Sequence, residues 1–173
     1  MTKHMPASSI ASERLTGPTE FRLAMRELAA TVSIVTAGQG DQRRGLTVTS
    51  LCSLSLEPPS LVVCVNKETD GHRAILQSGS FCVNVMAAEQ RILSDCFAGR
   101  TRRRGLDRFA DSDWTVLATG SPVLIDAIAV LDCDVINQLD HGTHTLFVGG
   151  VRAVRSDSNR PALIYRAGDY HVV

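Results

Sequence analysis

The stretch Gly45-Leu-Thr-Val-Thr-Ser-Leu-Cys-Ser-Leu-Ser-Leu-Glu-Pro-Pro59 is the most informative segment of this chain. Apolar and hydroxyl side chains alternate along it until a double proline ends the pattern. A period of two is typical of a β-strand with one apolar and one polar face, so the segment predicts a strand over residues 45–56. The apolar face carries Leu46, Val48, Cys52, Leu54 and Leu56, with Ser50 as its one hydroxyl residue, and the other face carries Thr47, Thr49, Leu51, Ser53 and Ser55.

A row of small hydroxyl side chains beside exposed backbone amides can hold a polar, planar ligand and a phosphate group. The alternative is an amphipathic strand whose threonine and serine side chains face only water. The alternation of residue types is compatible with both interpretations.

The composition is that of one globular domain with a hydrophobic core. The chain has 173 residues, of which 44% are hydrophobic and 21% are charged. Its 18 basic and 18 acidic residues balance, which argues against a dedicated nucleic-acid-binding protein. No apolar run is long enough to span a membrane, and residues 1–18 lack the apolar segment of a signal peptide.

The cysteines are five in number and lack the CxxC spacing of metal sites. Those at positions 64, 82 and 133 lie in apolar, strand-like runs. They are interpreted as buried free thiols, which predicts a cytoplasmic protein without a disulfide framework or a zinc site. The full set is Cys52, Cys64, Cys82, Cys96 and Cys133.

Residues 1–18 are small and polar and are expected to form a flexible arm before one domain over residues 19–173. Helical spacing predicts short helices over 20–30, with Thr19 as N-cap, and over 72–77 and 88–97. Apolar and β-branched runs predict strands over 31–36, 45–56, 61–65, 81–86, 114–117, 122–137, 145–154 and 162–166, with a bulge at Gly149-Gly150. Since no regular helices separate the strands, we expect a mainly β protein, an antiparallel barrel with helices outside it.

Several polar residues are candidates for chemistry. His141 and His144 flank a turn at a spacing that suits a metal, but no third ligand lies nearby in sequence, which favours a structural or ligand-contacting role. Asp126, Asp132 and Asp134 share one face of a predicted strand, and a solvated face is favoured there over acid–base catalysis.

Nucleotide-binding features are limited. The chain lacks a GxGxxG motif in a βαβ unit and lacks a P-loop, so a nicotinamide cofactor is not bound in the Rossmann manner. Asn66-Lys67 opens a loop after an apolar strand, which suits a phosphate but is also common in ordinary turns. The basic run 100–104 is compatible with a solvated loop, a contact to nucleotide phosphates or a docking patch.

Segments from Phe21 to the C-terminus together resemble the short-chain flavin reductase family, the reductase components of two-component flavin-dependent monooxygenases. The matching segments are 45–59, 61–66, 78–84, 97–99, 107–109 and 141–149, with Leu163-Ile-Tyr165 and Gly168. The resemblance implies an antiparallel Greek-key split β-barrel, of the FMN-binding type, with a few short peripheral α-helices. It implies a homodimeric NAD(P)H:flavin oxidoreductase that reduces FMN or FAD with NADH or NADPH and supplies reduced flavin to a partner monooxygenase.

The resemblance also implies roles for particular residues. It places the flavin phosphate near Asn66 and Lys67. The family's Gly-Asp-His motif, assigned to the nicotinamide, is here Gly142-Thr143-His144, which keeps the glycine and the histidine and makes His144 the residue that positions the nicotinamide. The flavin ring and ribityl chain are expected along Thr47, Thr49, Ser50, Leu51, Cys52 and Ser53, with further cofactor contacts at His72, Phe81, Arg104 and Gly142.

Two other functions are compatible with a split barrel. One is an oxidase similar to pyridoxamine-phosphate oxidase, which needs a basic substrate pocket, with the loop at 100–104 as the only candidate. The other is a flavin- or haem-binding module without turnover. Hydride transfer between two cofactors needs no general base, which agrees with the lack of a persuasive acid–base pair.

Overall fold

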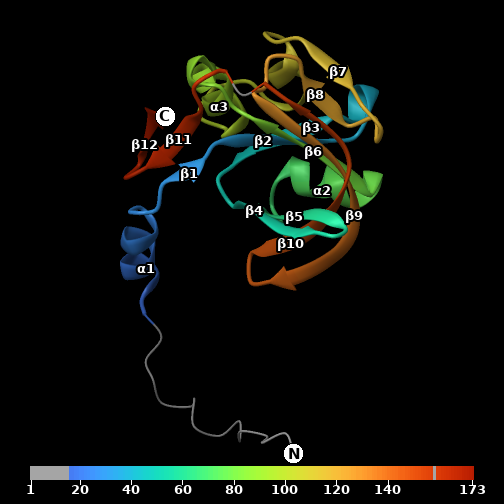
Figure 1. Ribbon diagram of the computed structural model, residues 1–173. Helices are drawn as coiled ribbons and strands as arrows, with labels where there is room; N and C mark the ends of the chain where they lie inside the picture. Colours follow the sequence, from blue (N-terminus) through green and yellow to red (C-terminus); the bar gives the residue numbers. More distant parts are fainter. Residues whose placement is uncertain (1–15, 158) are drawn as a thin grey trace, which may run out of the picture.

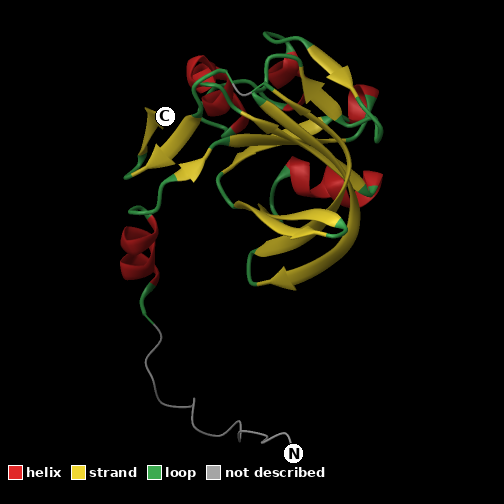
Figure 2. Ribbon diagram, viewed as in Figure 1, coloured by secondary structure: helices red, strands yellow, loops and turns green. Residues whose placement is uncertain are grey.

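The computed structural model describes residues 16–157 and 159–173, which fold around a curled antiparallel sheet (Figure 1). Strands dominate the chain, and the helices are few and short (Figure 2). The sheet has the strand order β3-β2-β6-β9-β10-β5-β4. Its strands are β2 (Ser33–Ala37), β3 (Arg44–Val48), β4 (Leu51–Leu56), β5 (Pro59–Asn66), β6 (Ser80–Val85), β9 (Ala129–His141) and β10 (His144–Ser156). The expected mainly β, antiparallel fold is confirmed.

The strand predicted over residues 45–56 is two strands, because the chain bends at Thr49 and Ser50. The two strands, β3 and β4, are the opposite edges of the seven-stranded sheet. β3 pairs with β2, whereas β4 pairs with β5. The sheet curls until its edges are close enough for this short bend to join them, so one extended segment serves both edges and has to turn between them (Figure 1).

The bend also ends the apolar face predicted for this segment. Leu46 and Val48 are buried before it, and Leu51 packs against the core after it. Leu54 and Leu56 are 55% and 87% exposed. Because the backbone changes direction at the bend, the alternation of the first half does not carry over to the second. The predicted apolar face is therefore confirmed for β3 and wrong for β4.

On the central strands, side chains at adjacent positions point to opposite faces of the sheet and pack into two different hydrophobic cores. Val35 faces the inside of the curl, and Ile34 beside it faces a second core on the outside. The helix predicted over 72–77 is α2 (Asp70–Ser78), which lies inside the curl and buries Ile75 there (Figure 1). Gly79, in the left-handed region at φ +66°, ends this helix.

Short elements cover the outer core. They are η1 (Gly40–Gln42), η2 (Ala88–Gln90), α3 (Arg91–Phe97), η3 (Gly105–Phe109), β7 (Trp114–Val116) and β8 (Pro122–Leu124). A small sheet in the order β1-β11-β12 lies beside them and consists of β1 (Ala30–Thr31), β11 (Leu163–Arg166) and β12 (Asp169–Val172). Strand β12 was not predicted. In the part of the chain that the structure describes, no helix is long and apolar enough to cross a membrane.

The N-terminal helix α1 spans Pro18–Met25 and is shorter than the predicted 20–30. Its N-cap is Gly17 rather than Thr19, and the Gly17 N–H donates to the Glu20 carboxylate at 3.2 Å. Of the arm predicted over residues 1–18, residues 1–15 lie outside the described residues.

The strand predicted over 122–137 is interrupted, because β8 ends before Asp126 and β9 begins after it. Asp132 is fully buried and accepts hydrogen bonds from the Thr119 N–H at 2.8 Å and the Thr119 hydroxyl at 2.5 Å. Asp134 forms an ion pair with Arg152. The predicted common exposed face is therefore wrong, because the loop before β8 covers and satisfies the central carboxylate.

Candidate functional site

The bend at Thr49 and Ser50 is exposed where the two edge strands meet. The Ser50 hydroxyl donates to the Cys64 carbonyl at 2.8 Å, and the Cys64 N–H donates to the Ser50 carbonyl at 3.1 Å. These hydrogen bonds fix the bend against β5. Since both bend side chains are small, they leave the surrounding backbone open to a ligand.

The row of hydroxyl groups predicted here is only partly available. The Thr47 hydroxyl donates to the Ser94 carbonyl of α3 at 2.7 Å, and the Ser55 hydroxyl is engaged by the backbone of Glu57. These hydroxyls support the fold and not a ligand. Of the other predicted flavin contacts, Leu51 is half-buried and Thr49, Ser50, Cys52 and Ser53 are exposed.

Two hollows meet at the bend and share Thr49 and Tyr165. We call them together the bend groove. The first hollow has a volume of about 150 Å³ and lies between β3, the end of α3 and the C-terminal hairpin β11–β12. The second has a volume of about 320 Å³ and lies between the bend, α1 and the β11–β12 turn. The first hollow is also lined by Val32, Thr47, Val48, Ala98, Arg100 and Tyr170.

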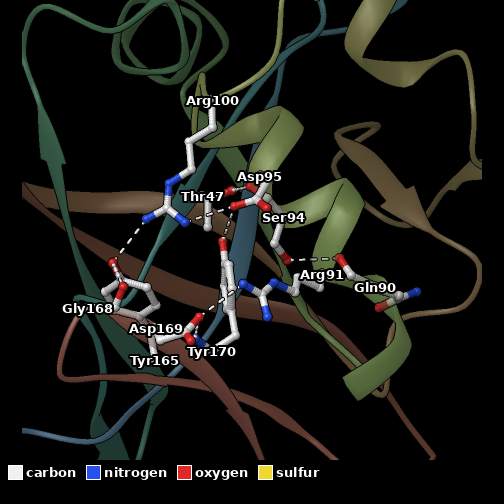
Figure 3. A network of polar contacts seen from close by, with 10 residues as sticks. All are labelled: Thr47, Gln90, Arg91, Ser94, Asp95, Arg100, Tyr165, Gly168, Asp169 and Tyr170. Atoms are coloured by element: carbon white, nitrogen blue, oxygen red, sulfur yellow. Dashed lines mark hydrogen bonds and ion pairs between the residues drawn. The ribbon is translucent and has the colours of Figure 1, made fainter.

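Arg100 lines the first hollow, and Figure 3 shows its polar contacts. Its guanidinium donates to the Asp95 carboxylate at 2.8 Å and to the Tyr165 hydroxyl at 3.0 Å. It also lies 5.5 Å from the ring centroids of both Tyr165 and Tyr170. The Tyr165 hydroxyl donates onward to the Gly168 carbonyl, and the Tyr170 hydroxyl donates to Asp95, both at 3.0 Å. A guanidinium is thus held against two aromatic rings beside the bend.

The same network joins α3 to the C-terminal hairpin (Figure 3). Arg91 donates to Asp169 at 3.0 Å and lies over the Tyr170 ring at 5.1 Å from its centroid. Burial, followed by the hydrogen bond to Asp95, raises the pKa of Tyr170 to about 12, so its hydroxyl remains a donor near neutral pH. The sequence interpretation assigned no role to the two tyrosines. The one sequence feature that pointed to this region was the match of residues 163–165 and Gly168 to the family.

Arg104, the residue of the basic run predicted to contact cofactor, does not line the bend groove. Its guanidinium donates to the carbonyl groups of Thr101 and Arg103 at 2.6 and 2.7 Å. The loop therefore folds this side chain onto its own backbone. The structure brings Arg100 to the groove instead.

A second group of predicted residues, which we call the turn cluster, gathers where β5 ends and the β9–β10 turn begins. The ladder sets Asn66 opposite His144, and the Lys67 N–H donates to the Thr143 carbonyl at 3.0 Å. The Thr143 hydroxyl lies 2.9 Å from Nδ1 of His144. Gly142, at φ +52°, supplies the left-handed residue of the turn. The predicted phosphate end and nicotinamide end therefore lie side by side, a short distance along β5 from the bend.

Lys67 in the turn cluster is compensated by an acidic side chain. Its Nζ lies 3.2 Å from the Asp140 carboxylate. Hydrogen bonds from Thr145 and from Lys67 lower the pKa of Asp140, which keeps that carboxylate ionised. A phosphate bound at Lys67 has to compete with this ion pair.

His72 does not face a surface open to a cofactor. The side chain is buried, and its Nε2 lies 2.8 Å from the Thr145 hydroxyl oxygen. The Thr145 hydroxyl itself donates to Asp140 at 2.5 Å, so Nε2 of His72 carries the proton and donates to Thr145. Burial lowers the pKa of His72. The structure therefore corrects the predicted cofactor contact to a buried support of the turn cluster.

Phe81 is likewise in the inner core and away from any surface that a ligand can reach. A Cβ atom on Gly149 would lie 2.5 Å from the Phe81 ring, so the glycine lets this ring pack against β10. The strand register shifts between Val148 and Gly149, which confirms the predicted bulge. The expected cofactor contact at Phe81 is corrected to a core position.

Metal ligands and cysteines add no further site. Across residues 16–157 and 159–173, no group of three or more His, Cys, Asp or Glu side chains is placed to hold a metal ion. The five cysteines are free. Cys82, Cys96 and Cys133 are buried, and Cys64 is half-buried, whereas Cys52 is exposed. Burial raises the pKa of Cys133 to about 12, which makes its thiol unreactive.

Comparison with known proteins agrees with this fold. A family model described as "Flavin reductase like domain" matches residues 25–173. The FMN reductase (NADH) RutF 2 of Methylorubrum extorquens (strain PA1) is 38% identical over 153 residues, which cover 88% of this chain and 88% of the relative. BorF, the flavin reductase component of a bacterial two-component tryptophan halogenase, superposes with a TM-score of 0.83 at 33% identity over 91% of this chain and 98% of BorF. The Streptomyces globisporus C-1027 NADH:FAD oxidoreductase SgcE6, solved with NAD and FAD fragments, gives 0.81 at 28% identity over 92% and 96%.

Proposed function

Since the chain belongs to the flavin reductase-like domain family, we propose that it is an NADH-dependent reductase of FMN. The observation that carries the proposal is the bend groove with the turn cluster beside it. A planar ring system needs an open, narrow site with free backbone, and a nicotinamide needs a second site within reach. Both features lie next to Ser50.

The residues present fit a flavin. Small side chains at the bend leave room for a flat ring, and the Arg100 guanidinium, which is paired with Asp95, lines the first hollow as a further hydrogen-bond donor. Backbone N–H groups along 49–53 are the donors that would hold the ring carbonyls, and such fixed donors favour the extra charge of a reduced flavin. These residues would hold a flavin whose N5 would supply the hydride acceptor for C4 of a dihydronicotinamide, so the bond making would belong to the cofactors and the binding to the protein.

His144 is the residue proposed to orient the nicotinamide. Its side chain is exposed, and the Thr143 hydroxyl fixes one ring nitrogen, which leaves Nε2 free for the nucleotide. Thr143 stands where the family motif has an acid, and its hydroxyl provides the contact to the imidazole in this chain.

The open groove also suits release of the reduced flavin to a second protein. BorF serves a two-component halogenase, and its likeness to this chain supports a two-component arrangement here. We propose that the acceptor is a flavin-dependent monooxygenase component. The free cysteines support a cytoplasmic location. We assign the activity to one domain over residues 19–173.

A homodimer is proposed from an apolar face of the sheet. The ladder aligns Cys64, Leu146 and Leu139 across β5, β10 and β9, on the side opposite the inner core. Leu139 is 63% exposed and Ile136 nearby is 56% exposed. An apolar face of this kind is typical of a protein–protein interface, and a second copy of the chain is the proposed occupant.

One assay tests the function. Purified protein is mixed with NADH and FMN, and the loss of the reduced nicotinamide absorbance band is followed with and without flavin. Flavin-dependent oxidation of NADH is the expected result. A yellow protein without turnover would indicate a flavin-binding module, and absence of both would contradict the proposal. An oxidase similar to pyridoxamine-phosphate oxidase is the other candidate, since Arg100 of the 100–104 loop lines the groove, and turnover that does not need NADH would favour it.

A further inference from the structure

We propose that the second hollow of the bend groove is a subsite for the adenosine 5′-phosphate half of a dinucleotide, with Arg22 as the contact to its phosphate. The inference rests on the proposed function and deepens it. The hollow includes Thr49 and Ser50 of the bend, so a ligand whose redox-active ring lies on the bend extends directly into it. Its volume of about 320 Å³ lies at the lower end of the range of ligand pockets, ~300–1,000 Å³.

One wall of the hollow is a single face of α1. Arg22, Met25 and Arg26 lie there at helical spacings of three and four residues. The opposite wall is the β11–β12 turn with the Tyr165 side chain. The other apolar residues that line the hollow are Leu28, Ala30 and Ala167. Methionine, leucine and tyrosine side chains suit the faces of a flat purine ring.

The two walls are held together by specific contacts. Arg26 donates from its guanidinium to the Ala167 carbonyl at 2.7 Å, and the Ala167 N–H donates to the Arg26 carbonyl at 2.7 Å. Gly168 has φ +92°, and a Cβ atom there would lie 2.4 Å from the Arg26 guanidinium. The absence of a side chain at Gly168 therefore lets α1 approach the hairpin. The hollow is a built feature of the fold with a defined width.

The charges of the hollow favour an anion. Its lining contains three arginines and no aspartate or glutamate. Arg26 is used to hold the hairpin, and Arg166 forms an ion pair with Glu27 at 3.1 Å. The Arg22 carbonyl accepts the Arg26 N–H within the helix, but its guanidinium makes no hydrogen bond or ion pair with the residues that the structure describes and is therefore available for a phosphate.

The contrast between the paired cations Arg100 and Lys67 and the unpaired guanidinium of Arg22 indicates a ligand longer than a mononucleotide. Arg100 is compensated by Asp95 and Lys67 by Asp140, whereas the Arg22 guanidinium in the lining of the second hollow has no acidic partner among residues 16–157 and 159–173. A mononucleotide ends at one phosphate. A dinucleotide adds a second phosphate and a purine, which is what the hollow accommodates. Both FAD and NADH carry this adenosine 5′-phosphate half.

The test compares the whole protein with its Arg22→Ala variant, and Arg152→Ala serves as the control because Arg152 lies on β10 outside the groove. AMP binding is measured by calorimetry. Affinities for FMN and FAD are measured by flavin fluorescence, and Michaelis constants are measured for NADH and for reduced nicotinamide mononucleotide. We expect the wild type to bind AMP and Arg22→Ala to weaken it about tenfold or more, with no change for Arg152→Ala.

The two sources of the ligand are distinguished by the same variant. If FAD supplies the adenosine phosphate, Arg22→Ala weakens FAD and leaves FMN unchanged. If NADH supplies it, Arg22→Ala raises the Michaelis constant for NADH and leaves that for the mononucleotide unchanged. A wild type that does not bind AMP, equal AMP affinity in both proteins, or equal loss of FMN and FAD would each overturn the proposal. AMP binding needs no turnover, so its result is separate from failure of the reductase assay.

Discussion

The hydroxyl of Ser50 donates to the carbonyl of Cys64 at 2.8 Å and thereby fastens the bend between the sheet edges to strand β5. The same strand leads to Asn66, where the turn cluster begins. The two halves of the proposed site are therefore held at a fixed separation by one strand. This relationship explains how an exposed bend can be a precise binding surface.

Ser50→Trp tests the position of the flavin. A large side chain at the bend would block the groove, so flavin affinity is expected to fall below detection in a fluorescence titration. Because Ser50 is exposed, the free energy of unfolding should fall by no more than about 1.5 kcal/mol, the value of one hydrogen bond. Gln77→Trp, at an exposed position on α2, is the matched control and should bind flavin normally. Normal flavin binding by Ser50→Trp would show that the flavin lies elsewhere.

His144→Ala tests the nicotinamide contact. Loss of the imidazole should raise the Michaelis constant for NADH more than that for flavin in steady-state assays. His141→Ala removes the other exposed histidine of the same turn and should change neither constant. Equal effects of His144→Ala on both substrates would indicate a general disturbance of the turn.

Asp132→Ala tests the buried carboxylate. Its removal leaves the N–H and hydroxyl groups of Thr119 without an acceptor, so the free energy of unfolding should fall by about 2–4 kcal/mol in chemical denaturation. Asp134→Ala removes a more exposed ion pair and should cost about 0–1 kcal/mol. Similar losses for the two variants would contradict the role given to Asp132.

His72 makes a pH dependence testable. Burial lowers its pKa in the folded state, so the unfolded chain binds the proton more tightly. The wild type should therefore lose stability relative to His72→Gln as the pH falls below the ordinary histidine value of 6.5. Denaturant midpoints measured between neutral and mildly acidic pH check the slope. Parallel curves for the two proteins would rule out this contribution.

Leu139→Glu tests the proposed homodimer. A charge in the apolar face should convert the protein to a monomer in sedimentation or light-scattering measurements. Leu76→Glu, at a similarly exposed leucine on α2, should leave the assembly unchanged. A monomeric wild type, or an unaffected Leu139→Glu variant, would refute this interface.

Most strands, the helices α2 and α3 and the bulge at Gly149 were predicted from local patterns. These features depend on the chemistry of neighbouring residues, such as β-branched alternation or the left-handed backbone at Gly79. The bend at Thr49 and Ser50 was not predicted, although the alternation of 45–56 breaks there, where two hydroxyl residues stand next to each other and Leu51 and Cys52 follow them. The curl of the whole sheet imposes it.

The candidate site likewise has a part that local sequence motifs indicated and a part that only the tertiary structure decided. The sequence by itself indicated the family and marked 45–56, Asn66-Lys67 and the turn at 142–144 as candidate parts of a flavin and nicotinamide site, since each of these is a short continuous motif. Only the tertiary structure decided that His72 and Phe81 are buried and that Arg100, rather than Arg104, meets Tyr165. Those outcomes depend on contacts between residues far apart in the chain, and the free energy of packing and hydrogen bonding that selects them is not encoded in any single segment.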